Sequence, residues 1–279
     1  MKQPARPALR YHGGKWRLST WIISHFPPHR VYVEPFGGGA SVLLKKERSY
    51  AEVYNDMDEE LVNLFRVLRD AELSRQLREA IYLTPFARTE HSQAYQETSD
   101  SVERARRTLV KSYMGFGSSG TWLYTGFRSN VKREGSIPAH NWAGYPDAIV
   151  DIVERLRGVI IENRPAIQVM QSYDSAKTLH YVDPPYVHST RGDRNRYRFE
   201  MDDQAHRELA ACLHGLRGGV VLSGYPCVLY DELFADWRFV DRMANADDHT
   251  ERIERLWVSP AAQAMMKHRQ LSLIGEVAA

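Results

Sequence analysis

A motif of one acid, two prolines and one aromatic residue, Asp183-Pro184-Pro185-Tyr186, follows an apolar, β-rich run at 178–182. Proline has no backbone N–H and restricts the residue before it, so a strand in this run must end and turn at the motif. The turn leaves the Asp183 carboxylate and the free proline carbonyls as acceptors beside the Tyr186 ring. Such a set suits a flat ring that carries an amine. The alternative is an ordinary turn after a strand.

Three consecutive glycines, Gly37, Gly38 and Gly39, lie between an apolar strand that starts at Val31 and an apolar helix. Glycines in such a loop let backbone amides reach a ligand closely, as in nucleotide sites. The loop lacks the spacing of the dinucleotide fingerprint and the Gly-Lys-Ser/Thr ending of a phosphate-binding loop. We therefore expect a nucleoside-like ligand rather than a triphosphate.

Asp56 ends a second predicted strand, at 52–56, about 20 residues after the glycine loop. An acid at this position commonly accepts the ribose hydroxyls of an adenosine group. The alternative role for Asp56 is the N-cap of the next helix, for which Asp58 competes.

A shorter motif, Tyr11-His12-Gly13-Gly14-Lys15, precedes an amphipathic run at 16–26 that predicts a helix. The two glycines allow close approach of a ligand to the backbone, and Lys15 is able to hold an anionic group there. A plain turn before a helix is the alternative.

The composition is that of an ordinary globular protein, with 279 residues, 43% hydrophobic and 26% charged. This length allows one large core with a smaller inserted lobe. The cysteines, Cys212 and Cys227, have no metal-ligand spacing and indicate no disulfide framework, which favours a reducing, cytoplasmic setting. No apolar stretch reaches the length of a membrane span, and the first residues have no apolar signal core. We expect no metal, no membrane partner and a monomer.

Charge is segregated along the chain although the net charge is only +2. Six Lys or Arg and no acid precede Glu34, and residues 75–134 carry ten basic and six acidic residues. Four arginines follow at 191–198, whereas acids dominate between 202 and 254. A basic face opposite an acidic remainder is typical of a nucleic-acid binder, although an arginine run is also found in solvated loops.

Strands and helices alternate regularly on both sides of residues 71–151. Further strands are predicted at 159–163, 178–182, 219–224, 237–243 and 254–258, and further helices at 166–173, 202–216 and 228–234. Within 71–151 the alternation stops, and glycines, aromatics and basic residues interleave as on surfaces that bind nucleic acid. The competing interpretation is an irregular lobe with a small aromatic core. The candidate nucleic-acid-binding residues are Arg128, Asn130, Lys132, Arg133, Arg191 and Arg194.

In order and type, these motifs resemble those of the Dam-type DNA adenine methyltransferases, although Tyr11 stands where that family often has tryptophan. The resemblance implies an α/β fold with a Rossmann-like sheet of about seven strands that uses S-adenosylmethionine. It also implies a catalytic domain at 1–70 and 152–279, with a mostly helical or irregular DNA-recognition lobe inserted at 71–151. The cofactor-binding residues that it implies are Tyr11, Lys15, Phe36, Gly37, Gly39, Asp56 and Asp183.

The same resemblance implies site-specific methylation of the exocyclic amine of adenine in double-stranded DNA. Asp183 and the Pro184 carbonyl would hold the two N–H groups of the amine, and Tyr186 would stack on a base flipped from the duplex. One alternative is methylation of the cytosine amine or of adenine in RNA. Others are a catalytically silent DNA-binding relative and a metal-dependent nuclease that uses Asp183, Asp193, Asp202 and Asp203.

Overall fold

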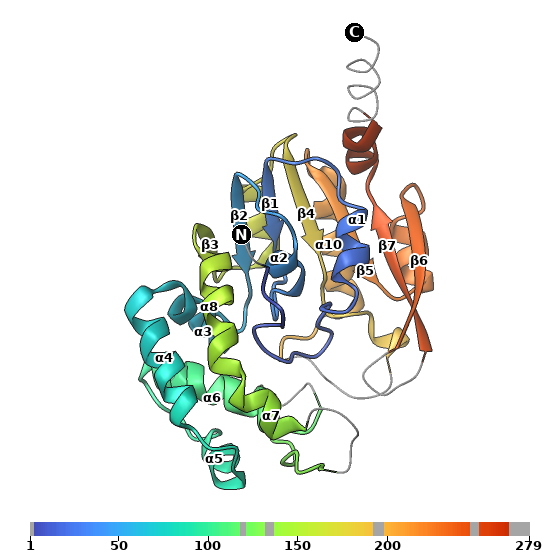
Figure 1. Ribbon diagram of the computed structural model, residues 1–279. Coiled ribbons are helices and arrows are strands. Elements are labelled where there is room, and N and C mark those ends of the chain that lie inside the picture. The colour runs from blue at the N-terminus through green and yellow to red at the C-terminus, as the bar shows by residue number, and fades with distance from the viewer. Residues whose placement is uncertain (1–2, 118–120, 132–136, 192–197, 246–250, 268–279) are drawn as a thin grey trace.

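The computed structural model describes residues 3–117, 121–131, 137–191, 198–245 and 251–267 (Figure 1). Within these residues, seven strands form one sheet in the order β3-β2-β1-β4-β5-β7-β6. The strands are β1 (Val31–Glu34), β2 (Ala51–Asn55), β3 (Val159–Glu162), β4 (Thr178–Val182), β5 (Gly219–Gly224), β6 (Arg238–Asn245) and β7 (Glu251–Val258). The predicted α/β sheet of about seven strands is confirmed.

The strand order reverses between β1 and β4: from β1 the chain adds β2 and β3 on one side, and it then crosses over to add β4 and β5 on the other. Strand β1 pairs in parallel with β2 on one side and with β4 on the other, and the parallel pairing continues to β3 and β5. Strand β7 runs antiparallel to both β5 and β6. Loops that follow β1 and β4 therefore diverge, and a crevice for a ligand forms at such a point.

Two helical layers cover the sheet because successive strand residues point to opposite faces. Tyr32 packs in a core with α1 (Ser19–Ser24), α2 (Ser41–Lys45), α3 (Glu59–Arg69) and α8 (Tyr145–Leu156). Its neighbour Val33 packs on the other face with Val169 of α9 (Ala166–Ser172). On that second face, Leu222 and Trp257 pack with α10 (Asp203–Gly215) and α11 (Val228–Leu233). A short 3₁₀ turn, His188–Thr190, follows β4.

The described residues within 71–151 are mostly helical rather than irregular. They contain α4 (Ala71–Leu83), α5 (Arg88–Gln93), α6 (Ser101–Met114) and α7 (Pro138–Ala143), which form a lobe below the sheet in Figure 1. Asp70 and Asp100 cap α4 and α6 by accepting hydrogen bonds from backbone N–H groups of their first turns. Helix α6 packs against α3 and α4, so the lobe shares its core with the sheet domain.

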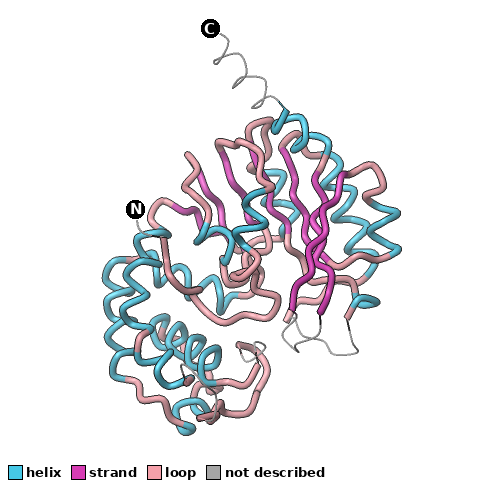
Figure 2. Tube along the Cα trace, turned by 45° about the vertical axis from the view of Figure 1, so that its right-hand side comes forward, coloured by secondary structure: helices cyan, strands magenta, loops and turns pink. Residues whose placement is uncertain are grey.

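Figure 2 shows the helices of this lobe gathered on one side and the strands on the other. Helix α8 begins in the lobe and continues to the sheet, so the proposed boundary between residues 151 and 152 falls inside one helix. None of the helices in the described residues is long and apolar enough to cross a lipid bilayer.

Candidate active site

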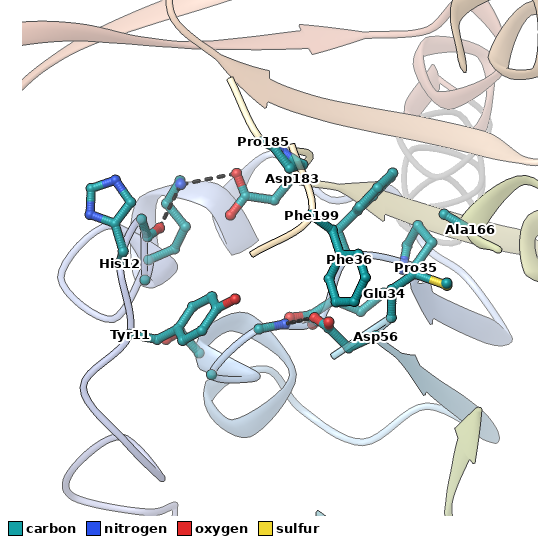
Figure 3. Close-up of a pocket in the computed structure, with 18 of the residues that line it drawn as sticks. Tyr11, His12, Glu34, Pro35, Phe36, Asp56, Ala166, Asp183, Pro185 and Phe199 are labelled. Carbon is teal, nitrogen blue, oxygen red and sulfur yellow. Dashed lines mark hydrogen bonds and ion pairs between the residues drawn. The ribbon is translucent and has the colours of Figure 1, made fainter. Parts of the chain in front are cut away.

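A pocket opens at the carboxyl ends of β1, β2 and β4, where the sheet order reverses (Figure 3). Four segments meet there: the motif at 11–15, the glycine loop, Asp56 at the end of β2, and Asp183 at the start of the turn after β4. All seven cofactor-binding residues expected from the sequence line this pocket: Tyr11, Lys15, Phe36, Gly37, Gly39, Asp56 and Asp183.

The glycine loop is pressed against the ring of Tyr54. A Cβ atom at Gly37 would lie 2.1 Å from Cε2 of that ring, so glycine is required at this position. Gly37 N–H donates to the Asn55 carbonyl at 2.8 Å, and the Tyr54 hydroxyl donates to the Gly38 carbonyl at 2.9 Å. Gly38 has a φ of +47°, which L side chains rarely adopt. These contacts fix the floor of the pocket.

Asp56 is held by the glycine loop on one side and by the start of helix α3 on the other, but it is not the N-cap of that helix. Its Oδ2 accepts a hydrogen bond from Gly38 N–H at 2.8 Å, and its Oδ1 accepts one from Asp58 N–H at 2.8 Å. The N-cap of α3 is Asp58, whose Oδ1 accepts from Glu60 N–H. Burial raises the pKa of Asp56 to about 6, against the opposing effect of the backbone donors at Asp58 and Gly38. Asp56 nevertheless lines the pocket, and each of its oxygens keeps a second lone pair that a ligand can use.

The Asp183 carboxylate is oriented through one of its oxygens. Lys15 Nζ lies 2.9 Å from Oδ1, and the Ser223 hydroxyl donates to the same oxygen at 2.7 Å. The described residues place no hydrogen-bond donor on Oδ2. In Figure 3 one oxygen of Asp183 is at the end of a dashed line, and the other is turned toward the open space of the pocket.

Lys15 faces two acids, the partly exposed Asp183 and the buried Glu254. Its ammonium lies 3.7 Å from Oε1 of Glu254 on β7, donates to the Gly13 carbonyl at 2.8 Å, and sits 4.8 Å from the centroid of the Tyr186 ring. Burial raises the pKa of Glu254, and the positive charge of Lys15 opposes this shift. The anionic partners of Lys15 are thus side chains of the protein itself.

Tyr186 is buried behind the pocket, with 5% of its surface exposed. Its hydroxyl donates to Glu254 Oε1, and its ring meets the edge of Tyr225 at a centroid distance of 4.7 Å. Pro184 is also buried, whereas Pro185 lines the pocket. Within the motif, Asp183 and Pro185 therefore face the pocket directly, and Tyr186 lies one layer deeper.

Glu34, at the end of β1, is a pocket residue that the sequence reading did not single out. Its Oε2 accepts hydrogen bonds from the Tyr32 hydroxyl at 2.7 Å and from Leu43 N–H at 3.0 Å. Burial raises the pKa of Glu34 to about 8. Burial thus favours the neutral, protonated form of Glu34. Its place immediately before the glycine loop is the sequence signal that marks it.

One wall of the pocket comes from residues 198–201, which sequence reading also missed. Phe199 lies beside Phe36 in Figure 3, and Arg198 Nη1 is 2.9 Å from Asp58 Oδ1. In the sequence, the one local indication that these residues form a pocket wall is that the apolar Phe199 and Met201 lie between a run of arginines and the acidic start of α10.

The expected DNA-binding residues are absent from the lining of the pocket or fall outside the described residues. Arg128 donates to the Tyr113 carbonyl at 3.3 Å, and Asn130 is exposed. Arg191 has 8% of its side chain exposed and forms an ion pair with Glu200 at 2.6 Å. Lys132, Arg133 and Arg194 are outside the described residues. The described residues contain no group of three or more His, Cys, Asp or Glu side chains arranged to hold a metal ion.

Strand order and pocket together define a class of protein. Among the described residues, the sheet has β7 reversed beside β5, with a glycine loop and an acid at its switch point, as in Rossmann-like methyltransferases. The family model described as D12 class N6 adenine-specific DNA methyltransferase matches residues 11–267. The chain belongs to this family, which confirms the resemblance seen in the sequence.

Three proteins of similar sequence have names that fit this family. DNA adenine methylase of Escherichia coli (strain K12) is 25% identical over 240 residues, which cover 82% of this chain and 84% of that protein. The protein of the same name from Serratia marcescens is 27% identical over 252 residues, with 83% and 86% covered. Type II methyltransferase M1.LlaDCHI of Lactococcus lactis subsp. cremoris is 26% identical over 259 residues, with 83% and 85% covered.

Proposed function

We propose that this protein transfers a methyl group from S-adenosylmethionine to the exocyclic amine of adenine at specific sites in double-stranded DNA. One observation carries the proposal. Oδ2 of Asp183, the oxygen that does not accept from Ser223, faces the pocket that Asp56 and the glycine loop also line. An acceptor for an amine and a site for an adenosyl group are therefore side by side.

The pocket fits a cationic nucleoside because it combines acids with apolar walls. Asp56 would accept the ribose hydroxyls, Gly37 and Gly39 would lie against the methionine end, and Phe36 and Tyr11 would border the remainder. Lys15 is positioned to border both the cofactor and Asp183. When bound, S-adenosylmethionine supplies an electrophilic methyl group on a positively charged sulfur.

Asp183 activates the amine by accepting a hydrogen bond. The lone pair of an adenine amine is delocalised into the ring, so the nitrogen attacks poorly unless acceptors favour a more tetrahedral geometry. Asp183 and the Pro184 carbonyl are proposed as these acceptors, aimed at the positive charge that develops on nitrogen. Tyr186 would stack on the base, which leaves the duplex at a cost of roughly a few kcal/mol. Lys15, 4.8 Å from the Tyr186 ring centroid, would then have to move aside.

DNA recognition is assigned to residues 71–151 and to nearby basic residues. Arg128, Asn130, Lys132 and Arg133 belong to this lobe, and Arg194 follows the turn after β4. Arg191 would contact DNA only if its ion pair with Glu200 opened. We propose a monomer that acts on DNA in the cytoplasm without a metal ion.

The decisive experiment combines the purified protein, labelled S-adenosylmethionine and duplex DNA, followed by nucleoside analysis. Methylated adenine supports the proposal. Methylated cytosine, or transfer to RNA alone, supports the alternative substrates. Binding of DNA without transfer of any methyl group supports a silent relative. Single-molecule sequencing of DNA from cells that express the protein then reports the modified base together with its sequence context.

A further inference from the structure

Ser223 lies on β5, whose other residues are apolar or glycine, and its hydroxyl faces the Asp183 carboxylate. The strand sequence is Gly-Val-Val-Leu-Ser-Gly, and Ser223 is fully buried. Tyr181 is opposite Val221, and Val182 is opposite Leu222, so the register brings Ser223 beside Asp183 at the pocket end of the sheet. A buried hydroxyl needs a partner, and here it finds a carboxylate.

The hydrogen of Ser223 can be assigned from distances. A serine hydroxyl has one hydrogen, and its candidate acceptors are Asp183 Oδ1 at 2.7 Å, the Tyr181 hydroxyl at 3.1 Å and the Val182 carbonyl at 3.5 Å. The shorter contact to a charged acceptor is much the stronger one. The Tyr181 hydroxyl, 3.1 Å from Ser223 Oγ, must then be the donor of that pair. The order of donation is Tyr181 to Ser223 to Asp183.

This chain of donors fixes the rotation of the Asp183 carboxylate. Lys15 also approaches Oδ1, but its ammonium is on a long, flexible side chain and serves Glu254 as well. Ser223 is rigidly placed by a central strand, and the ring of Tyr181 is buried. With Oδ1 committed to two donors, Oδ2 is the oxygen that stays available to the pocket.

We propose that Ser223 is a positioning residue for methyl transfer. Together with Tyr181 it holds Asp183 so that Oδ2 accepts the N–H of the adenine amine in the geometry that transfer needs. This inference rests on the proposed function. It predicts an effect on the rate of transfer with little effect on cofactor binding, because Ser223 is not among the residues that line the pocket.

The test uses single-turnover methylation of duplex DNA by the full-length protein. Loss of a hydrogen bond to a charged group predicts that Ser223→Ala slows transfer by about 10- to 100-fold. The affinity for S-adenosylmethionine, measured by calorimetry, is expected to change less than about twofold. Ser223→Thr keeps the hydroxyl and is expected to restore most of the rate. Tyr181→Phe keeps the ring and is expected to slow transfer by a smaller factor, about 2- to 10-fold.

Ser259 supplies the matched control. It is also buried, and its hydroxyl accepts from Val220 N–H of the same strand, at the end of β5 far from the pocket. Ser259→Ala is expected to lower stability but leave the transfer rate per folded molecule unchanged. A rate loss in Ser259→Ala equal to that in Ser223→Ala would assign the effect to strand packing and overturn the proposal.

The remaining outcomes separate this inference from the proposed function. If the wild type transfers methyl groups while Ser223→Ala and Tyr181→Phe both match its rate, the positioning role is wrong and the proposed function stands. If the wild type binds cofactor and DNA but transfers nothing, both fail together. If Ser223→Ala does not fold, Tyr181→Phe, which keeps the ring, decides the question; because Tyr181 lines the pocket, its affinity for S-adenosylmethionine is measured beside its rate, and a slower rate at unchanged affinity supports the positioning role.

Discussion

The ammonium of Lys15 lies 2.9 Å from Oδ1 of Asp183, and the side chains are 7% and 17% exposed. The same ammonium is 3.7 Å from the buried Glu254. One cation therefore compensates two acids in the interior of the site. Removing it leaves both acids without a counter-charge, which is costly because a buried charge has little solvent to stabilise it.

Lys15→Met is accordingly expected to lower the free energy of unfolding by about 3 kcal/mol at neutral pH. The measurement is urea denaturation followed by circular dichroism. Lys45→Met is the control, because the Lys45 ammonium donates to the Trp16 carbonyl instead of a carboxylate. This control is expected to lose less than about 1 kcal/mol. Equal losses in the two variants would show that the acids of the site do not depend on Lys15.

Asp183→Ala is expected to abolish methyl transfer, with a rate loss of about 10³-fold or more, because the acceptor for the amine is removed. DNA binding should stay largely intact, since the expected DNA contacts are on other elements. The rate is followed with labelled cofactor, and binding is followed by fluorescence anisotropy of a labelled duplex. Transfer at the wild-type rate would rule out the role given to Asp183.

The affinity for S-adenosylmethionine is expected to depend on pH through Asp56. Its pKa is raised to about 6 by burial, so the carboxylate is ionised above pH 6 and accepts the ribose hydroxyls there. As the pH falls through 6, protonation removes an acceptor, and the affinity should fall by up to about tenfold per pH unit. Calorimetry between pH 5 and pH 8 measures this slope.

Asp56→Ala is the control for the pH experiment. It should bind the cofactor weakly at every pH, with a flat profile over this range, while its affinity for DNA changes less. An unchanged cofactor affinity in Asp56→Ala, or the same slope as in the wild type, would contradict the assignment of Asp56 to the ribose.

The sequence revealed those parts of the site that are contiguous in the chain. The glycine loop, Asp56 and Asp183 were predictable because each follows a strand, and parallel strands bring their carboxyl ends to one edge. Ser223 and Glu254 were not, because they reach the site from β5 and β7 only through strand pairing. Their strands show no local signal that separates a buried functional polar residue from a structural one.

The lobe was harder to interpret for a different reason. Helices α4 and α6 carry many charged residues that pair on their surfaces, such as Arg75 with Glu72 and Arg106 with Glu103. Their apolar faces are completed by the sheet domain, where Leu77 and Leu109 join the shared core. Helical order at 71–114 therefore depends on tertiary packing, which the sequence alone does not display.

Two substitutions in the glycine loop should separate fold from ligand binding. Gly37→Ala places a Cβ 2.1 Å from the Tyr54 ring, which is fully buried and cannot move away, so a loss of about 1–3 kcal/mol in stability is expected. At Gly39 the nearest atom to an added Cβ is 3.5 Å away, in Tyr11, which is ordinary contact. Gly39→Ala should therefore keep near-wild-type stability.

The two variants should also lose affinity for the cofactor for different reasons, one by a direct clash with the ligand and the other by loss of the folded loop. Gly39→Ala is expected to weaken binding of S-adenosylmethionine in a fully folded protein, because its methyl group would enter the space proposed for the methionine end. Gly37→Ala should lose binding in parallel with stability. Thermal unfolding and calorimetry on both variants measure the two quantities. Wild-type cofactor affinity in Gly39→Ala would show that the methionine end lies elsewhere in the pocket, and a stable Gly37→Ala would show that Tyr54 does not fix the loop.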